Sequence, residues 1–372
     1  MPPDEFRHAR RVLAVRLDNI GDCVMLGPGL RSLRAGLPDA EITLLASPAG
    51  SQAAGLLPWV DAVMTHRVVW QDVGGRMPLD PARERDLVRT IRRRGFDAAF
   101  LFTSYSQSPW PPAYACYLAG IPLRVGQSRE FGGSLLTHAV SPPPDEAHQV
   151  DRNLHLLEGV GFDAVGRGLE LAVPEEAAHA ADALLAEAGV DPEEPFVAVA
   201  PGASCAARRY DPVRFGQAAR RLAARLGAAV VIVAGPRETV IADAVLVAAG
   251  DRRVVSLAGR TTVAETAGVL RRAGLVLAND SGPMHIADAL RRPMVVLFSG
   301  TDLESQWRPR TAPARLLRRP TDCAPCRRFT CPFGMACLDI PADEVAAHAE
   351  ELWNRSLSSP NPLLPEPAAC RP

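Results

Sequence analysis

Residues 12–46 read VLAVRLDNIGDCVMLGPGLRSLRAGLPDAEITLLA, and this stretch decides the fold. It opens with a short apolar run at 12–16, which is typical of a buried strand, and a loop follows at 18–22. Residues 24–36 carry apolar side chains at helical spacing, and 42–46 form the next apolar run. Strand, loop, helix and strand at this spacing predict a parallel α/β sheet.

The second half of the chain repeats this pattern after the break at Ser141-Pro-Pro-Pro-Asp145 and a helix at 148–161. A further strand of the first half is expected at 97–102. In the second half we expect strands at 196–200, 229–234, 254–257, 275–278 and 294–298, and helices at 212–226, 263–272 and 283–290. The pattern predicts two doubly wound α/β domains, residues 1–170 and 171–355, with a ligand cleft at the carboxyl ends of their sheets. The proline-rich tail, 356–372, is predicted to be disordered.

Composition excludes several classes of protein. The 372 residues have a formal net charge of −1, which argues against a nucleic-acid binder. None of the 41 basic residues is lysine, so every cationic side-chain contact to a substrate is made by arginine unless a histidine is charged. The first residues do not resemble a signal peptide, and no apolar stretch reaches the roughly 18–20 residues of a membrane span. We therefore expect a cytoplasmic protein with at most peripheral membrane contact.

The sharpest chemical signal is Asn279-Asp-Ser-Gly-Pro-Met-His285, which follows a strand and opens a helix. The free N–H groups of a helix start attract a diphosphate, and Gly282 permits the tight turn. Ser281 and His285 could donate to phosphate oxygens, whereas Asp280 could cap the helix or hold the loop. The same pattern also fits a simple helix N-cap.

Two more strand ends in the second half carry polar residues. Ser204 and Arg208 follow the strand at 196–200 and could bind a diphosphate, although a solvated loop with surface arginines, including Arg209, is the better explanation of this segment taken alone. Glu238 follows the next strand and could accept hydrogen bonds from ribose hydroxyls, or be a surface residue.

In the first half, Gly21 and Asp22 follow the first strand. Gly21 allows close approach of a ligand or another backbone. Asp22 could take the proton from an acceptor hydroxyl across the cleft, and Asp18 in the same loop has the same chemistry. Helix N-capping is the alternative role for either carboxylate.

No dinucleotide-binding glycine motif, P-loop, zinc-protease motif or nucleophile elbow occurs in the chain. Four of the eight cysteines are close together at Cys323, Cys326, Cys331 and Cys337. In a cytosolic protein they are either reduced thiols or ligands of one structural zinc ion.

The chain resembles glycosyltransferase family 9, the ADP-heptose:lipopolysaccharide heptosyltransferases. The shared segments are Ile20-Gly-Asp22, Ala119-Gly-Ile-Pro-Leu-Arg-Val-Gly126, Pro201-Gly-Ala203 with Arg208-Arg-Tyr-Asp-Pro212, Leu257-Ala-Gly-Arg-Thr261, residues 279–290 and the cysteine segment. The resemblance implies a GT-B fold and inverting transfer without a catalytic metal or other required cofactor. It also implies a nucleotide-sugar donor, ADP-heptose foremost, and a glycan, glycolipid or small-molecule acceptor.

The resemblance further assigns roles to residues of this chain. The general base falls on Asp22, and the family's phosphate-binding lysine falls on Arg208, which keeps the charge but changes the geometry. The ribose-binding acid falls on Glu238. The remaining donor-binding residues that we expect are Gly21, Ser204, Arg209, Asp280, Ser281, Gly282, Pro283, Met284 and His285.

Other functions stay open at this stage. The same fold could use another nucleotide sugar, such as a hexose donor, or a natural-product acceptor. A non-catalytic protein that binds a sugar nucleotide would keep the second-half site and tolerate loss of Asp22. Segments 103–110 and 124–131 are the expected acceptor contacts.

Overall fold

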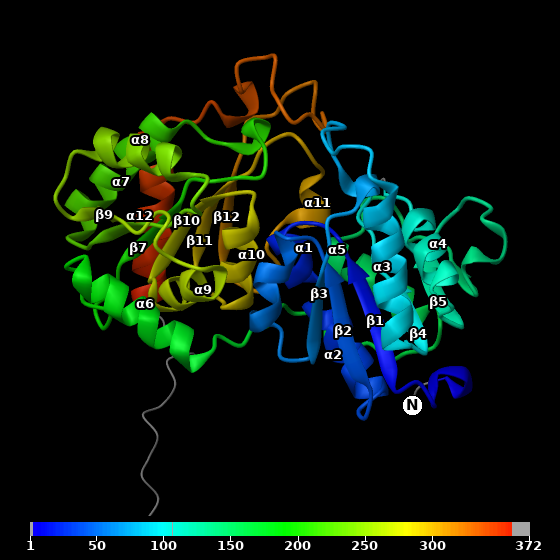
Figure 1. The fold of residues 1–372 in the computed structure, drawn as a ribbon. Helices are drawn as coiled ribbons and strands as arrows, with labels where there is room; N and C mark the ends of the chain where they lie inside the picture. Colours follow the sequence, from blue (N-terminus) through cyan, green and yellow to red (C-terminus); the bar gives the residue numbers. More distant parts are fainter. Residues whose placement is uncertain (1–2, 106, 359–372) are drawn as a thin grey trace, which may run out of the picture.

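The computed structural model describes residues 3–105 and 107–358, and these form two six-stranded sheets, one after the other along the chain (Figure 1). The strands of the first sheet are β1 (Arg11–Arg16), β2 (Glu41–Ala46), β3 (Ala62–Thr65), β4 (Ala98–Leu101), β5 (Leu123–Gln127) and β6 (His138–Val140). Those of the second sheet are β7 (Val197–Ala200), β8 (Val230–Ile232), β9 (Val254–Ser256), β10 (Leu275–Asn279), β11 (Met294–Leu297) and β12 (Ala314–Leu317).

Both sheets are parallel and have the same topology. The first runs β3-β2-β1-β4-β5-β6, and the second runs β9-β8-β7-β10-β11-β12, which is the same order shifted along the chain. In register, Ala14 of β1 lies between Leu44 of β2 and Phe100 of β4. The strand order reverses between β1 and β4 and again between β7 and β10, and such switch points are where doubly wound sheets bind ligands. The predicted pair of doubly wound α/β domains is therefore confirmed.

Helices cover both faces of the first sheet. Alternate residues of β1 serve the two faces: Val12 and Ala14 pack with one helix layer, and Leu13 and Val15 pack with the other. The first layer holds α1 (Ile20–Met25), α2 (Gly27–Gly36), η2 (Gly50–Leu56) and α5 (Gln149–Glu158). The second layer holds α3 (Pro81–Arg94) and α4 (Trp110–Leu118). Because both faces are covered, the central strands read as continuous apolar runs.

The second sheet is covered in the same way. One face carries α6 (Glu175–Glu187), α9 (Val263–Arg272) and α10 (Gly282–Ala289), and the other carries α7 (Pro212–Leu226), α8 (Thr239–Ala249) and α12 (Ala342–Ser358). The short helix α11 (Glu304–Trp307) lies beside the first half, where Gln306 donates to the Asp145 carbonyl. The apolar cluster under α1 and α2 continues into α9 and α10, so the two halves share part of their core.

Local signals explain why some helices begin and end where the sequence predicts. The helix α7 has the predicted bounds, 212–226: the Asp211 side chain accepts from the Arg214 N–H at its start, and Gly227 adopts a left-handed φ of 66° at its end. The helix α9 also has its predicted bounds, with Thr262 and Glu265 forming a capping box.

The region after β1 differs from the prediction. We expected a loop at 18–22 and one helix at 24–36, but α1 already begins at Ile20 and the helix breaks after Met25. The Asp22 carboxylate accepts from the Asn19 N–H, which favours a helix start at this point. Pro28 has no N–H to bond the Val24 carbonyl, so α2 starts as a separate helix.

The domain boundary predicted at residue 170 lies between α5, which packs against α2, and α6, which packs against α9. The predicted disordered tail begins at 356, but α12 continues to Ser358, so its first three positions are helical. Residues 359–372 lie outside the described part of the chain. Within that described part, no helix is long and apolar enough to cross a membrane.

Candidate active site

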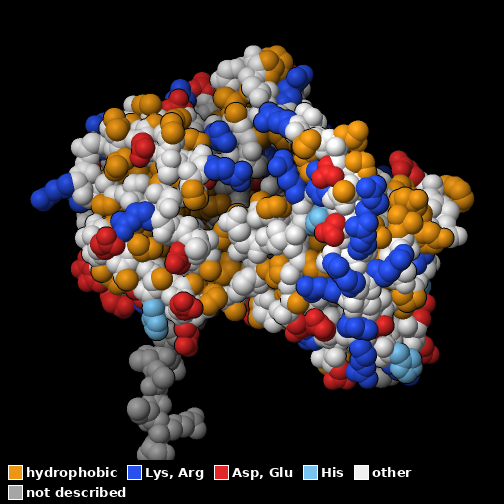
Figure 2. Space-filling view, in the orientation of Figure 1, with side chains coloured by type: hydrophobic (Ala, Val, Ile, Leu, Met, Phe, Trp, Pro, Cys, Tyr) orange, Lys and Arg blue, Asp and Glu red, His pale blue; other side chains and the backbone are white. Residues whose placement is uncertain are grey.

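A cleft of about 790 Å³ lies where the carboxyl ends of the two sheets face each other. The first half lines it with residues such as Asp18, Asp22 and Ser104, and the second half with Arg208 and Asp302. Figure 2 shows the hollow between the two halves, with arginine side chains around it. A cavity built from both switch points could hold two substrates at once, one on each half.

Arg16, at the end of β1, is the charge around which the first half of the site is built. It is fully buried, and its Nε and Nη2 atoms lie 2.9 Å from Oδ2 of Asp18 and Oδ1 of Asp22, respectively. Its Nη2 also donates to Ser104 Oγ at 2.6 Å. Burial alone would lower the pKa of Arg16, but the two carboxylates outweigh it and raise that pKa.

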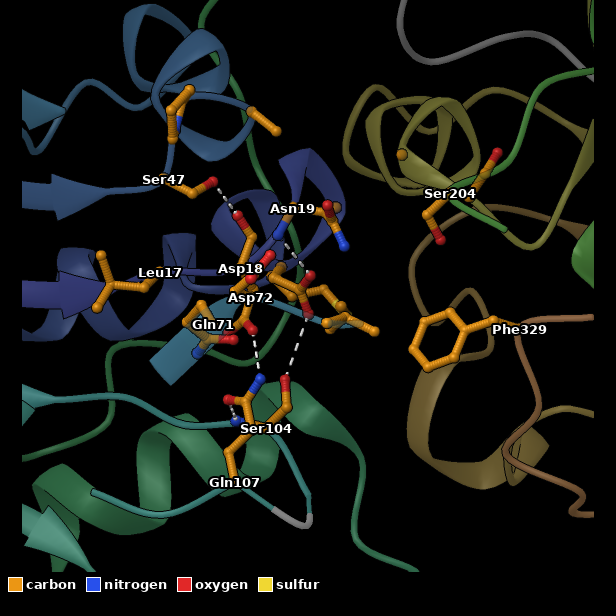
Figure 3. Close-up of a pocket in the computed structure, with 18 of the residues that line it drawn as sticks. Leu17, Asp18, Asn19, Ser47, Gln71, Asp72, Ser104, Gln107, Ser204 and Phe329 are labelled. Carbon is orange, nitrogen blue, oxygen red and sulfur yellow. Dashed lines mark hydrogen bonds between the residues drawn. The ribbon is translucent and has the colours of Figure 1, made fainter. Parts of the chain in front are cut away.

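The two carboxylates have different environments. Burial raises the pKa of Asp18 to about 6 despite Arg16, and its other oxygen accepts from the Gln107 amide (Figure 3). Asp22 uses Oδ1 for Arg16 and Oδ2 for the Asn19 N–H at 3.0 Å, so it caps α1 as well as facing the cleft. Asp22 is also the carboxylate that acts electrostatically on Asp280 and His285 across the cleft. Of the two carboxylates, Asp22 is therefore the one that faces the second half across the cleft.

The two halves meet through glycines at the base of the cleft. A Cβ atom on Gly21 would lie 2.7 Å from His285 Cδ2, and one on Gly282 would lie 3.3 Å from the Ile20 side chain. Side chains at either position would push α1 and α10 apart. The glycines therefore bring the start of α10 next to the start of α1, which carries Asp22.

The start of α10 is suited to binding an anion. Ser281, rather than Asp280, occupies the N-cap position, and no side chain of the described residues caps the first N–H groups of the helix. The interpretation of Asp280 as a helix cap is therefore wrong. The Asp280 carboxyl is buried, its Oδ2 has no hydrogen-bond partner among the described residues, and burial raises the pKa of Asp280 to about 6. Burial lowers the pKa of His285 to about 3, so its imidazole is neutral near pH 7.

Arg208 supplies the cation on this side of the cleft. It forms an ion pair with Asp302, and its Nε donates to Thr301 Oγ1 at 3.1 Å. Burial opposes its charge, but Asp280 and Asp302 outweigh this and raise the pKa of Arg208. An incoming diphosphate would meet a positioned guanidinium, a neutral imidazole and uncapped helix N–H groups.

The structure brings most, but not all, of the predicted site residues to the cleft. Those that line it are Gly21, Asp22, Ser204, Arg208, Asp280, Ser281, Gly282 and His285. Pro283, Met284, Arg209 and Glu238 are not among the lining residues. Arg209 donates to the Ala203 carbonyl and so braces the loop, whereas the Glu238 carboxylate lies against Gly202 and accepts from the Gly235 N–H.

Sequence reasoning missed several residues that hold the site together. Asn279 is fully buried, accepts from the Tyr210 N–H at 3.0 Å and donates to the Pro201 carbonyl at 2.7 Å, which ties the end of β10 to the loop after β7. Arg16 and Asp302 were also missed. The signal for Arg16 was an arginine at the end of an otherwise apolar strand, and Asp302 had no sequence signal.

Of the two segments expected to contact the acceptor, 103–110 contributes residues to the cleft lining and 124–131 does not. Ser104, Tyr105 and Gln107 line the cleft, opposite Ser204 and Phe329 (Figure 3). Arg124 instead is buried and donates to backbone carbonyls, such as that of Leu135, so it holds its own loop rather than a substrate.

The four clustered cysteines line one small cavity of about 20 Å³. In the segments that the structure describes, no group of three or more histidine, cysteine or acidic side chains is arranged to hold a metal ion. A structural zinc at Cys323, Cys326, Cys331 and Cys337 stays a prediction.

Comparison with known proteins identifies similar sequences and folds. A family model described as Glycosyltransferase family 9 (heptosyltransferase) matches residues 84–336. Lipopolysaccharide heptosyltransferase 3 of Escherichia coli is 26% identical over 296 residues, which cover 78% of this chain and 83% of the relative.

Solved structures of the same kind superimpose over nearly the whole chain. A glycosyl transferase family 9 protein from Veillonella parvula has a TM-score of 0.77 at 20% identity, covering 94% of this chain and 99% of that one. The E. coli ADP-heptose lps heptosyltransferase II has a TM-score of 0.73 at 21% identity, covering 94% and 100%. The expected GT-B fold is confirmed.

Proposed function

The chain belongs to glycosyltransferase family 9, the heptosyltransferases, and from this premise we propose an inverting enzyme that transfers a sugar from a nucleoside diphosphate to an acceptor hydroxyl. One observation carries the proposal. Asp22 from the first half, and Arg208 with the uncapped start of α10 from the second half, line the same cleft. A base and a leaving-group site on opposite walls are what a single displacement at an anomeric carbon requires.

Asp22 is the proposed general base. The acceptor oxygen bonds to the anomeric carbon while the bond from that carbon to the diphosphate oxygen breaks, and the hydroxyl proton passes to the Asp22 carboxylate. Arg16 and the Asn19 N–H hold both oxygens of this carboxylate, so its orientation is fixed before the substrate arrives. Attack from the wall opposite the leaving group inverts the anomeric configuration.

The leaving nucleoside diphosphate gains negative charge as the bond breaks. Arg208 and the first N–H groups of α10 are placed to stabilise it, and Arg237 lines the same cavity. These groups supply positive charge without a divalent metal, and we propose that the chemistry needs none. Transfer that persists in excess EDTA would support this, and loss of transfer restored by added metal would contradict it.

The proposed donor is ADP-heptose, and the proposed acceptor is a saccharide hydroxyl of a lipopolysaccharide-type glycolipid. The support is the similarity to lipopolysaccharide heptosyltransferases, which include an ADP-heptose lps heptosyltransferase. Calorimetric titration with ADP, UDP and GDP tests the nucleotide part, because one site cannot bind all three bases equally if it contacts the base. Preference for UDP or GDP would redirect the proposal to another nucleotide sugar.

The test of the whole proposal compares D22N with D18N. Removal of a general base lowers transfer by about 10²–10⁴-fold, so D22N should lose turnover while still binding the donor nucleotide. D18N is the matched control, because it also removes one of the two carboxylates paired with Arg16. Anomeric proton signals of the product should show inversion. Preserved turnover in D22N with loss in D18N would assign the base to Asp18 instead.

A further inference from the structure

The helix α3 presents an unusual concentration of positive charge. It carries six arginines and two acidic residues, a net charge of +4 in 14 residues. Arg85, Arg89 and Arg93 follow one another at intervals of four, so they project from one side of the helix. All three are exposed, and none of them has an ion pair in the described parts of the chain. Arg93 donates only to the neutral Thr90 hydroxyl, so this side of the helix is a row of guanidinium groups whose charge no described carboxylate neutralises.

A groove of about 340 Å³ runs between this row and α4. Arg85, Arg89 and Arg92 line one side together with Glu84, whose charge is paired with Arg83. The apolar lining comes from Trp70, Val88, Pro111, Tyr114 and Leu118. Tyr114 is 52% exposed and Leu118 is 40% exposed. Figure 2 shows the arginines over α3 and a group of apolar side chains beside them over α4. Cationic and apolar groups thus lie next to each other on one surface.

Two loops that adjoin this surface expose large apolar side chains. Leu79, just before α3, is 95% exposed. Phe131 is 98% exposed, in a loop anchored to the start of α4 by the packing of Gly132 against Trp110. Exposing leucine and phenylalanine to water this fully is unfavourable, so a partner that covers them gains free energy.

We infer that the α3–α4 face docks on the surface of an anionic phospholipid bilayer. Guanidinium groups are attracted to anionic headgroups, and tyrosine, leucine and phenylalanine side chains insert at the headgroup–acyl boundary. A row of unpaired arginines beside an apolar strip matches both layers of that boundary. An acidic protein partner would satisfy the charge but not the protruding single apolar side chains.

The docking face lies beside the cleft. Trp70 lines both the groove and the cleft, so one side chain forms part of the wall of each. A lipid-linked acceptor in the bilayer would then present its sugar at the mouth of the cleft. This last point rests on the proposed function, whereas the docking itself does not.

The experiment is co-sedimentation of the purified full chain with vesicles, without nucleotide or acceptor. We expect binding to vesicles of phosphatidylglycerol and phosphatidylcholine in equal amounts, little binding to phosphatidylcholine alone, and weakening by salt. At roughly fivefold per arginine near an anionic surface, the R85Q/R89Q/R93Q variant should bind about 100-fold more weakly. Equal binding of wild type to both kinds of vesicle, or none to either, would overturn the inference.

Two further variants distinguish binding through the α3–α4 face from a general attraction of the protein's arginines to anionic lipid. R220Q/R252Q/R271Q removes three exposed arginines of the second half that form no ion pair with any described residue, and it should bind like the wild type. Y114S/L118S should lose the binding that remains at high salt. Thermal unfolding and ADP titration confirm that each variant is folded. A control triple that loses as much binding as the α3 triple would also overturn the inference, and in both cases the transferase proposal would remain separately testable.

Discussion

Replacing Arg16 with glutamine should be among the most damaging single changes in the first half. Arg16 is fully buried and pairs with both Asp18 and Asp22 at 2.9 Å. At an effective dielectric constant near 20, each attraction is worth up to about 4 kcal/mol. Part of this is offset by the burial of the charges, and breaking a buried pair costs about 3–5 kcal/mol in practice. We expect R16Q to lose about that much free energy of unfolding near pH 8.

The pH dependence of this loss follows from Asp18. Its folded pKa, about 6, lies above its ordinary value of 3.8, so the folded state holds this proton more tightly than the unfolded chain does. The contribution to stability is complete below pH about 4 and is lost as the pH rises through about 6. Without Arg16 the folded pKa of Asp18 rises further. The penalty of R16Q should therefore be largest near pH 8 and should shrink toward pH 5, where Asp18 is protonated.

Urea unfolding at the two pH values measures the effect, with hydrogen exchange of the β1 peptide to assign it to the first half. R16Q/D18N is the control, because it removes one of the two unpaired carboxylates together with the arginine. This double variant should be more stable than R16Q near pH 8. An R16Q penalty that is the same at both pH values, or a double variant less stable than R16Q, would refute the reasoning.

Three other predictions follow from the site. G21A places a Cβ 2.7 Å from His285 and should lower kcat/KM at least about tenfold in a protein that still folds. G55A is the control, because its Cβ meets nothing within 4 Å, and it should leave kcat/KM unchanged. A G21A enzyme with the kcat/KM of the wild type would contradict the close approach. N279A leaves the buried Tyr210 N–H unpaired and should lower the free energy of unfolding by about 1–3 kcal/mol, measured by urea unfolding. It should also weaken ADP binding, measured by calorimetry. Asp280 loses its negative charge below its pKa of about 6, which removes its repulsion of a bound diphosphate. ADP-ribose, whose diphosphate does not titrate in this range, should therefore bind more tightly as the pH falls from about 8 to 5. If D280N shows the same pH dependence of affinity, another group causes it.

The fold was largely predictable because central parallel strands are covered on both sides and read as apolar runs. The strands of the second sheet at 275–278 and 294–298 were found within one residue. Four strands were missed. The edge strands β3, β6 and β12 are short and partly exposed, with few apolar residues in sequence, and β5 is buried but reads Leu-Arg-Val-Gly-Gln rather than as an apolar run. The early start of α1 was missed because a helix of six residues offers too little periodicity.

The site was predictable where a residue follows a strand and was not predictable where it depends on packing. Asp22, Arg208 and the start of α10 follow strands, so topology alone brings them to the same edge. The position of Glu238 against Gly202, away from the cleft lining, depends on how two loops pack. The role of Arg16 depends on two carboxylates that turn back toward their own strand, which no periodicity reveals.

The glycine contact at the base of the cleft has a consequence for turnover. Gly21 and Gly282 meet as bare backbone, but the apolar cluster under α1 and α2 continues from there into α9 and α10, so separating the halves at this point would expose apolar side chains to water. On the seam beside the short helix α11, by contrast, His148 bonds the Arg308 carbonyl and Thr311 accepts from the Leu169 N–H. The two halves are thus joined by apolar packing at α1 and α10 and by hydrogen bonds on the other seam. Water can replace hydrogen bonds that part but cannot replace apolar contacts, so we expect the α1–α10 contact to act as the hinge and the hydrogen-bonded seam to part when a donor enters or a nucleotide leaves.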